Sequence, residues 1–326
     1  MTADDLVVDA HLHVFRPASV RRRPVDGLAP AGRDAPVEDL LEVMAAHGVD
    51  RAVLVPLGPE DVYVAEARAA HPERFAAVAV AGPEIQGRRR GDRPPVEILH
   101  GRLGEGFSGL RTQWLGVPGR PLRDSPMLPV LRELAERGLP LWSYVPPEQL
   151  PLLRELPELL PGLPVVLNHL GFAPHDMRVD AHGRPWFEDP FPPPVVETVL
   201  GLARHPNVYL MFSGQYALSR EEPPYTDLDG LVRAFADAYG ADRMLWASDY
   251  PWTRDVPGYG VLLELADHVL PGLSAAERAA LHGGTALSLF PALAASPDRA
   301  AAPDRAVFPE RAASPSPAPD RRSHPR

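Results

Sequence analysis

Short apolar runs alternate with longer amphipathic segments along most of this 326-residue chain. An apolar run followed by a segment with helical spacing is typical of a parallel β-strand and the helix that leads to the next strand. The alternation recurs about eight times. The predicted strands are residues 6–9, 52–55, 75–81, 109–112, 140–144, 165–168, 208–212 and 244–248.

The segments between these runs have the apolar spacing of amphipathic helices, most clearly at residues 37–47, 127–137 and 228–239. Eight strand–helix units close most naturally into a barrel, so the predicted fold is a TIM-type (β/α)8 barrel of the α/β class. An open, doubly wound sheet is the alternative. It is disfavoured because His11 and His13 follow the first strand, where that fold would carry a glycine-rich phosphate loop.

Composition excludes several classes of function. The net charge is −10 and the one short basic cluster, residues 88–90, is interpreted as a solvated loop, so nucleic acid is not expected as a partner. The chain has no cysteine, which excludes disulfides, thiolate metal sites and a cysteine nucleophile. The N-terminus does not resemble a signal peptide, and the apolar runs are too short to span a membrane. We expect a cytoplasmic protein that acts on a small molecule.

Two regions depart from the repeat. Residues 172–194 are long and rich in proline and aromatic side chains, and we predict that they form a lid or side loop over the site. Residues 1–292 are predicted to form the barrel, and residues 293–326 a disordered tail rich in proline and alanine. The sequence does not indicate an oligomeric state.

Candidate catalytic side chains stand at the ends of three predicted strands. His11 and His13 are two residues apart, so they project to the same side at the end of the first strand. His169 follows the sixth strand and Asp249 follows the eighth. The carboxyl ends of the strands form the catalytic face of a barrel, and strand eight lies next to strand one when the barrel closes. These four side chains are therefore predicted to form the catalytic group.

Taken together, these motifs resemble those of the amidohydrolase-2 group of the amidohydrolase superfamily. The matching segments are residues 9–13, 109–111, 168–171 and 246–251, with residues 284–290 similar to the final helix of the family. In the decarboxylase-like branch, strand five ends in a histidine that binds a metal, but Tyr144 stands there in this chain. The lactonase-like branch, which includes 2-pyrone-4,6-dicarboxylate lactonase and sugar lactonases, tolerates this loss, so the chain is identified with that branch.

The resemblance implies hydrolysis of a lactone by an activated water. Asp249 would act as general base, and His11, His13 and His169 would polarise the carbonyl. The implied cofactor is one divalent metal ion (Zn or Mn) held by His11, His13 and Asp249, with metal-free catalysis as an open alternative. A metal-dependent decarboxylase and a non-catalytic binding protein remain the rival interpretations. The predicted substrate-binding residues lie at or after strand ends, and they are Arg111, Gln113, Tyr144 and Ser213.

Overall fold

The computed structural model describes residues 6–89 and 91–294, and within them the parallel strands form a closed ring. The strands pair in the order β1-β2-β3 and β4-β5-β6-β7-β10-β11. Their bounds are β1 (Val8–Leu12), β2 (Arg51–Leu54), β3 (Phe75–Ala77), β4 (Ala79–Val80), β5 (Leu110–Thr112), β6 (Leu141–Ser143), β7 (Val165–Leu167), β10 (Val208–Phe212) and β11 (Met244–Trp246).

Two sets of backbone hydrogen bonds complete the ring. Strands β3 and β4 are halves of one predicted strand: Val78 N donates to Leu54 O of β2, and Ala79 N donates to Gly109 O just before β5. On the other side, the chain after β11 pairs with β1, since Asp249 N donates to the His11 carbonyl at 3.0 Å. The predicted TIM-type barrel is confirmed.

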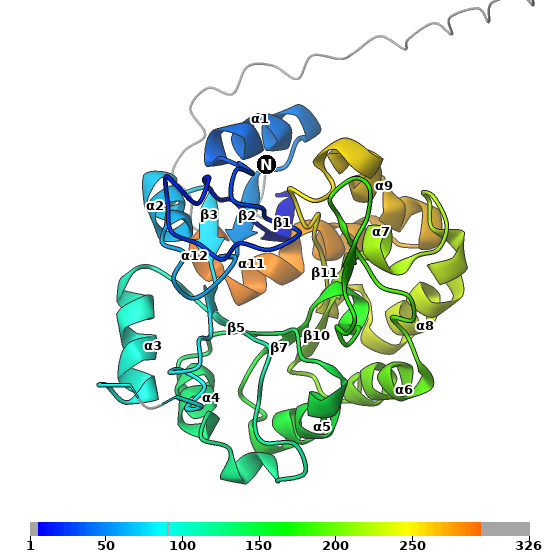
Figure 1. Ribbon diagram of the computed structural model, residues 1–326. Helices are drawn as coiled ribbons and strands as arrows, with labels where there is room; N and C mark the ends of the chain where they lie inside the picture. Colours follow the sequence, from blue (N-terminus) through cyan, green and yellow to red (C-terminus); the bar gives the residue numbers. More distant parts are fainter. Residues whose placement is uncertain (1–5, 90, 295–326) are drawn as a thin grey trace, which may run out of the picture. The chain divides into compact units, whose positions relative to one another are not determined.

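Helices surround the strands on the outside of the ring, as Figure 1 shows. In α1 the buried residues Val37, Leu40 and Met44 recur at helical spacing and face the barrel, and Gly48 ends the helix with a φ of 69°. The helices are α1 (Val37–His47), α2 (Tyr63–Ala70), α3 (Pro95–Gly104), α4 (Leu128–Glu136), α5 (Leu150–Leu159), α6 (Pro193–Leu202), α7 (Gln215–Leu218), α8 (Asp229–Tyr239), α9 (Tyr259–Val269), α10 (Ala275–Ala279), α11 (Thr285–Leu289) and α12 (Pro291–Ala294).

The hydrophobic core has two parts. One lies between the strands and the surrounding helices. The other fills the barrel, where Trp142 of β6 is fully buried and its ring contacts that of Phe290, with 5.4 Å between ring centroids. Leu293 of α12 belongs to the same interior cluster. The interior of the barrel is therefore packed, and ligand binding is left to the ends of the strands.

The predicted strand positions are confirmed; most bounds differ by one or two residues, and the first and third strands differ in ways that matter for the site and the sheet. The first strand was expected to end at residue 9 but extends to Leu12, so His11 lies within it. The third strand is divided at Val78, because its first half pairs with β2 and its second half with β5.

Segment 172–194 contains a short antiparallel hairpin, β8 (Arg178–Val179) and β9 (Pro185–Trp186), before α6 begins at Pro193. The predicted tail lies outside the described residues, apart from residues 293–294, which belong to α12. Among the helices described, we find none with the length and apolar character that crossing a bilayer requires.

Candidate active site

A change of register in β1 turns both of its histidines toward the barrel axis. Val8 and Ala10 belong to the interior cluster, whereas Leu12 packs outward among the helices. The pairing of β1 with β2 shifts between these positions, as in a β-bulge. His11 and His13 consequently face the same side as Asp249, although strict alternation from Val8 would have turned them away from the axis.

His169 and Asp249 both adopt left-handed backbone conformations. His169 begins the short turn η4 (His169–Gly171) after β7 and has a φ of 47°. Asp249 lies three residues beyond β11 and has a φ of 58°. Residues other than glycine seldom adopt such angles, and they cluster at functional sites, where the surrounding structure holds them in place.

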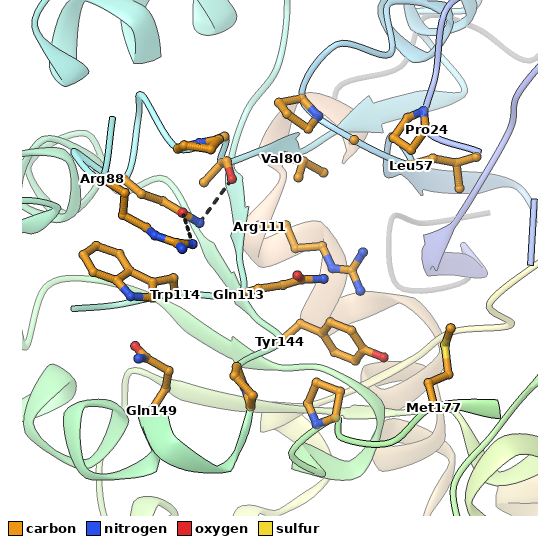
Figure 2. Close-up of a pocket in the computed structure, with 18 of the residues that line it drawn as sticks. Pro24, Leu57, Val80, Arg88, Arg111, Gln113, Trp114, Tyr144, Gln149 and Met177 are labelled. Atoms are coloured by element: carbon orange, nitrogen blue, oxygen red, sulfur yellow. Dashed lines mark hydrogen bonds between the residues drawn. The ribbon is translucent and has the colours of Figure 1, made fainter. Parts of the chain in front are cut away.

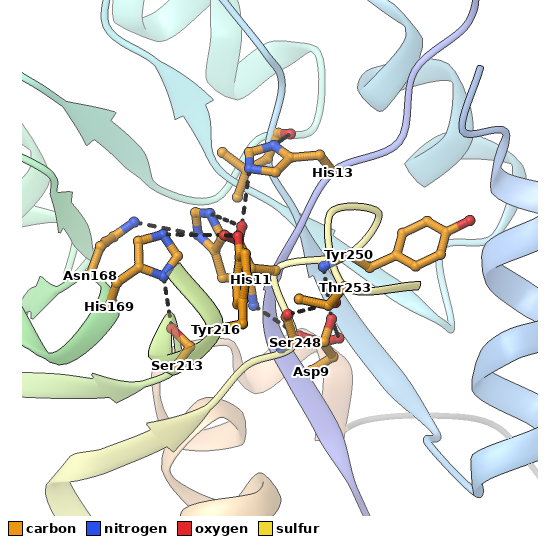
Figure 3. A network of polar contacts seen from close by, with 12 residues as sticks. Asp9, His11, His13, Asn168, His169, Ser213, Tyr216, Ser248, Tyr250 and Thr253 are labelled. Carbon is orange, nitrogen blue, oxygen red and sulfur yellow. Dashed lines mark hydrogen bonds and ion pairs between the residues drawn. The ribbon is translucent and has the colours of Figure 1, made fainter. Parts of the chain in front are cut away.

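The three imidazoles surround the Asp249 carboxylate. His11 Nε2 and His13 Nε2 lie 3.6 and 3.5 Å from Asp249 Oδ1, and His169 Nε2 lies 3.8 Å from Asp249 Oδ2. Figure 3 shows His11 and His13, from the end of β1, and His169, from the turn after β7, close to one another. The structure therefore brings together all four predicted catalytic residues, which are separated by up to 238 positions in the sequence.

The other nitrogen of each imidazole has its own partner. His13 Nδ1 lies 2.8 Å from the carbonyl oxygen of Val55, and His169 Nδ1 lies 2.9 Å from Ser213 Oγ. A carbonyl oxygen only accepts, so His13 Nδ1 carries the proton in that bond. In a neutral His13 ring, Nε2 then presents a lone pair toward Asp249, as a metal ligand does.

Burial determines the charge of the two inner histidines. It holds the pKa of His169 at about 4 and that of His11 well below its usual value. Burial works to raise the pKa of Asp249, but the interactions of that carboxylate with His169, His13 and His11 outweigh this effect and hold its pKa well below the usual range. At neutral pH, Asp249 is therefore ionised beside uncharged His11 and His169.

This group fits a divalent metal ion. His11, His169 and Asp249 each offer a ligand atom, and the three atoms lie within 4.8 Å of one another. Among the described residues, His11 Nε2 and Asp249 Oδ1 are buried without a hydrogen-bond partner, so the protein alone leaves both atoms unsatisfied. Imidazole and carboxylate ligands suit zinc-type ions. The site can hold one divalent ion, with His13 Nε2 3.5 Å from the same carboxylate oxygen.

A cavity of about 870 Å³ lies at the same end of the barrel. Arg111, Gln113 and Tyr144, which we expect to bind substrate, are among the residues that line it (Figure 2). Tyr144 connects the cavity to the catalytic group, since its ring lies edge-on to that of His169 with 5.7 Å between centroids. Ser213 does not line the cavity; it is buried and holds His169.

The predicted lid contributes to this cavity. Four consecutive residues of segment 172–194 are among those that line it, and they are Pro174, His175, Asp176 and Met177. Phe187, from just after β9, also lines the cavity. The segment therefore forms part of the cavity wall.

Arg111 is a cation that forms no ion pair within the described part of the chain, and Asp249 acts on its charge only at longer range. Its guanidinium carbon lies 4.4 Å from the centre of the Tyr144 ring. Its Nε atom is buried, and the side chain makes no hydrogen bond or ion pair with the described part of the chain. Burial lowers the pKa of Arg111, which shows that the charged form is poorly solvated there. An anionic group of a ligand in the cavity would pair with the Arg111 guanidinium.

Sequence reasoning missed two groups that support Asp249. Tyr216 of α7 donates a hydrogen bond of 2.6 Å to Asp249 Oδ2. Behind the site, Asp9 accepts hydrogen bonds from Ser248 and from the Tyr259 hydroxyl, which ties β1 to the end of β11 and to α9. Asp9 belongs to the motif already noted, but Tyr216 stands in a short loop helix that has no motif in the sequence.

Comparisons with known proteins agree with this architecture. L-fucono-1,5-lactonase of Burkholderia ambifaria is 27% identical over 258 residues, covering 78% of this chain and 83% of that protein. 4-Sulfomuconolactone hydrolase of Hydrogenophaga intermedia is 24% identical and covers 74% of each. A solved structure from Pseudomonas putida, described as a 2-pyrone-4,6-dicarboxylic acid hydrolase, is 26% identical with a TM-score of 0.64, covering 88% of this chain and 98% of that one. The model of the amidohydrolase family matches residues 8–292, and the chain belongs to this family.

Proposed function

We propose that this enzyme hydrolyses the ester bond of a lactone derived from a small organic acid or a sugar acid. The observation that carries the proposal is the ionised, buried Asp249 carboxylate, whose Oδ1 is without a hydrogen-bond partner among the described residues and faces His11 and His13. The relatives support the substrate class, because two are named for lactones and the third for the hydrolysis of a pyrone acid.

The reaction follows from the positions of these groups. A water at Asp249 Oδ1 loses a proton to the carboxylate while its oxygen forms a bond with the lactone carbonyl carbon. Without a metal, His11, His13 and His169 stabilise the negative charge that develops on the carbonyl oxygen where their ring nitrogens carry a hydrogen that faces it. The ester C–O bond then breaks, its electron pair moves to the ring oxygen, and that oxygen takes the proton from Asp249. A divalent ion bound by the histidines and Asp249 would polarise the carbonyl and increase the acidity of the water.

The cavity favours a lactone that carries a carboxylate. The planar guanidinium of Arg111 can bind a carboxylate through two parallel hydrogen bonds, and among the described residues it forms no ion pair that would have to be broken first. Tyr144 and Gln113 line the same cavity and offer hydrogen bonds to the remaining oxygens of the ring. A volume of about 870 Å³ is ample for a single ring with its substituents.

The test is a panel of lactones, with and without a carboxylate, assayed on metal-analysed protein before and after chelation. We expect ring opening with water as the only co-substrate. Loss of activity on chelation, with recovery on adding zinc or manganese, assigns the metal-dependent form; unchanged activity in metal-free protein assigns the metal-free form. Carbon dioxide release without ring opening would identify a decarboxylase instead, and binding without any chemical change would identify a binding protein.

Asp249→Asn is the matched variant for the base. Asparagine preserves the shape of the side chain but cannot take a proton from water, so we expect at least a hundredfold loss of kcat, within the usual range for a general base. Circular dichroism and the melting temperature should show a folded barrel. Wild-type turnover in this variant would disprove the role of Asp249.

A further inference from the structure

The turn after β10 contacts both catalytic elements that lie beside it. Ser213 directly follows the strand, and its hydroxyl lies 2.9 Å from His169 Nδ1. Gly214 follows with a φ of 86°, and a Cβ atom there would lie 2.7 Å from the Cβ of His169. This close approach requires glycine, and it places the short helix α7 against the site. Tyr216, the second residue of α7, is buried and reaches Asp249 (Figure 3).

The hydrogen bond from Tyr216 makes the two oxygens of Asp249 different. Oδ2 accepts from the Tyr216 hydroxyl at 2.6 Å, whereas Oδ1 is buried without a partner among the described residues. Oδ1 is also the oxygen nearer to His11 and His13, and Oδ2 lies 3.8 Å from His169. One oxygen is thus anchored by the protein, and the other is available to a water or an ion.

We propose that Tyr216 is a positioning residue that fixes the plane of the Asp249 carboxylate, so that Oδ1 is the atom that receives the proton of the attacking water. This inference rests on the proposed lactone hydrolysis. If the Asp249 carboxylate turned freely about its Cβ–Cγ bond, the lone pairs of Oδ1 would point away from the attacking water most of the time. A short hydrogen bond to a buried hydroxyl removes this freedom.

The same contact favours return of the proton. When Oδ1 takes the proton from water, Oδ2 becomes the carbonyl oxygen of a neutral acid and accepts a weaker hydrogen bond from Tyr216. When the lactone C–O bond breaks, the ring oxygen gains the electron pair and takes the proton from Oδ1, which restores the carboxylate and the strong bond. Tyr216 therefore stabilises the ionised form of Asp249, which is the form present at the end of each turnover.

The chain offers matched controls for Tyr216→Phe. Tyr225 is buried a few residues further on, and its hydroxyl has no hydrogen-bond partner among the described residues, so Tyr225→Phe removes the same atom without breaking a bond. The Tyr239 hydroxyl donates to the Val199 carbonyl at 2.7 Å, outside the catalytic group. Tyr239→Phe therefore reports what losing a buried tyrosine hydrogen bond does to stability alone.

The experiment measures kcat and KM for a hydrolysed lactone, the melting temperature and the crystal structure of all three variants. For Tyr216→Phe we expect kcat to fall by about ten- to a hundredfold, the loss expected for one hydrogen bond to a charged group, while KM changes less than about threefold. Tyr225→Phe and Tyr239→Phe should keep the wild-type kcat. In an Asp249→Asn background, Tyr216→Phe should cause no further loss, because it acts through the carboxylate.

Three results would overturn the inference: wild-type kcat in Tyr216→Phe, an equal loss of kcat in Tyr239→Phe, or a further loss in the Asp249→Asn background. The crystal structures separate this inference from the proposed function. If the wild-type enzyme opened no lactone, the proposed function would fail. A rotated Asp249 carboxylate in Tyr216→Phe, but not in Tyr225→Phe, would still show the positioning role, and an unrotated one would refute it.

Discussion

Arg111 offers a prediction in which stability and activity change in opposite directions. Its guanidinium contacts the Tyr144 ring but forms no ion pair with any described residue. The proposed function assigns this cation to a substrate carboxylate, so in the empty protein its charge is balanced only at longer range, by Asp249. Replacing Arg111 by methionine keeps much of the aliphatic volume of the side chain and removes the charge.

The magnitudes follow from these contacts. A buried donor of a charged group that lacks a partner costs about 1–3 kcal/mol. The cation–π contact that methionine would lose contributes about 0.5–2 kcal/mol. The midpoints of these two ranges leave a net gain in stability of roughly 1 kcal/mol for Arg111→Met, which raises the melting temperature by a few degrees in a domain of this size. Loss of a bidentate contact with a carboxylate should cost about 3–4 kcal/mol, or roughly a hundred- to a thousandfold in kcat/KM.

The assay compares two lactones with the same ring, one with a carboxylate and one without. In Arg111→Met, kcat/KM should fall only for the anionic lactone. In Arg111→Lys, kcat/KM for that lactone should lie between the values of Arg111→Met and the wild type, because lysine keeps the positive charge but cannot donate two parallel hydrogen bonds. Calorimetry gives the melting temperatures. Equal losses on both lactones, together with a lower melting temperature, would show that Arg111 is a structural residue and refute this reasoning.

Two further predictions concern the catalytic group itself. The pKa of His169 is about 4 in the folded protein and near 6.5 in the unfolded chain, so the unfolded state binds more protons between these pH values. His169 alone should therefore lower the free energy of unfolding by about 3 kcal/mol as the pH drops from 6.5 to 4, and the lowered pKa of His11 acts in the same direction. Urea midpoints should fall more steeply with pH in the wild type than in His169→Gln, and equal slopes would contradict the assignment. Gly214→Ala should lower stability by about 1–2 kcal/mol, because alanine is strained in the left-handed conformation. It should also reduce kcat, because the new Cβ would lie 2.7 Å from the Cβ of His169 and displace that residue. A melting scan and a turnover assay check the two effects, and wild-type values in both would refute the close approach of Gly214 to His169.

The barrel and the meeting of its catalytic residues could be predicted from the sequence. Buried parallel strands are continuous apolar runs, and those of this chain are separated by helices of ordinary length. Once the eighth strand is placed beside the first, His11 and Asp249 must approach each other, although 238 positions separate them. The structure joins them directly, with Asp249 N donating to the His11 carbonyl. The order of the strands in the barrel is therefore enough to predict that His11 and Asp249 lie close together.

The details that determine the chemistry depend on features without a sequence signal. The register shift in β1 reverses the alternation of side chains, and both Asp9 and Leu12 look like ordinary strand residues. Tyr216 lies on a four-residue helix in a loop, where neither periodicity nor a motif marks it. Ser213 was expected to bind substrate because it ends a strand, but its hydroxyl contacts His169. A side chain at the end of a strand can either face the substrate or hold a catalytic residue in place. Its tertiary contacts decide between the two, and the sequence does not show them.

The contact between His13 and Asp249 makes metal binding at this site depend on pH. His13 Nδ1 donates to the Val55 carbonyl, so a neutral ring directs the lone pair of Nε2 at an ionised oxygen 3.5 Å away. Two acceptors in this position repel each other unless a cation lies between them. A divalent ion satisfies both atoms, and so does a proton on Nε2, which makes His13 a charged donor to the carboxylate. Ion and proton compete for the same lone pair, so the affinity for a metal must fall as the pH is lowered.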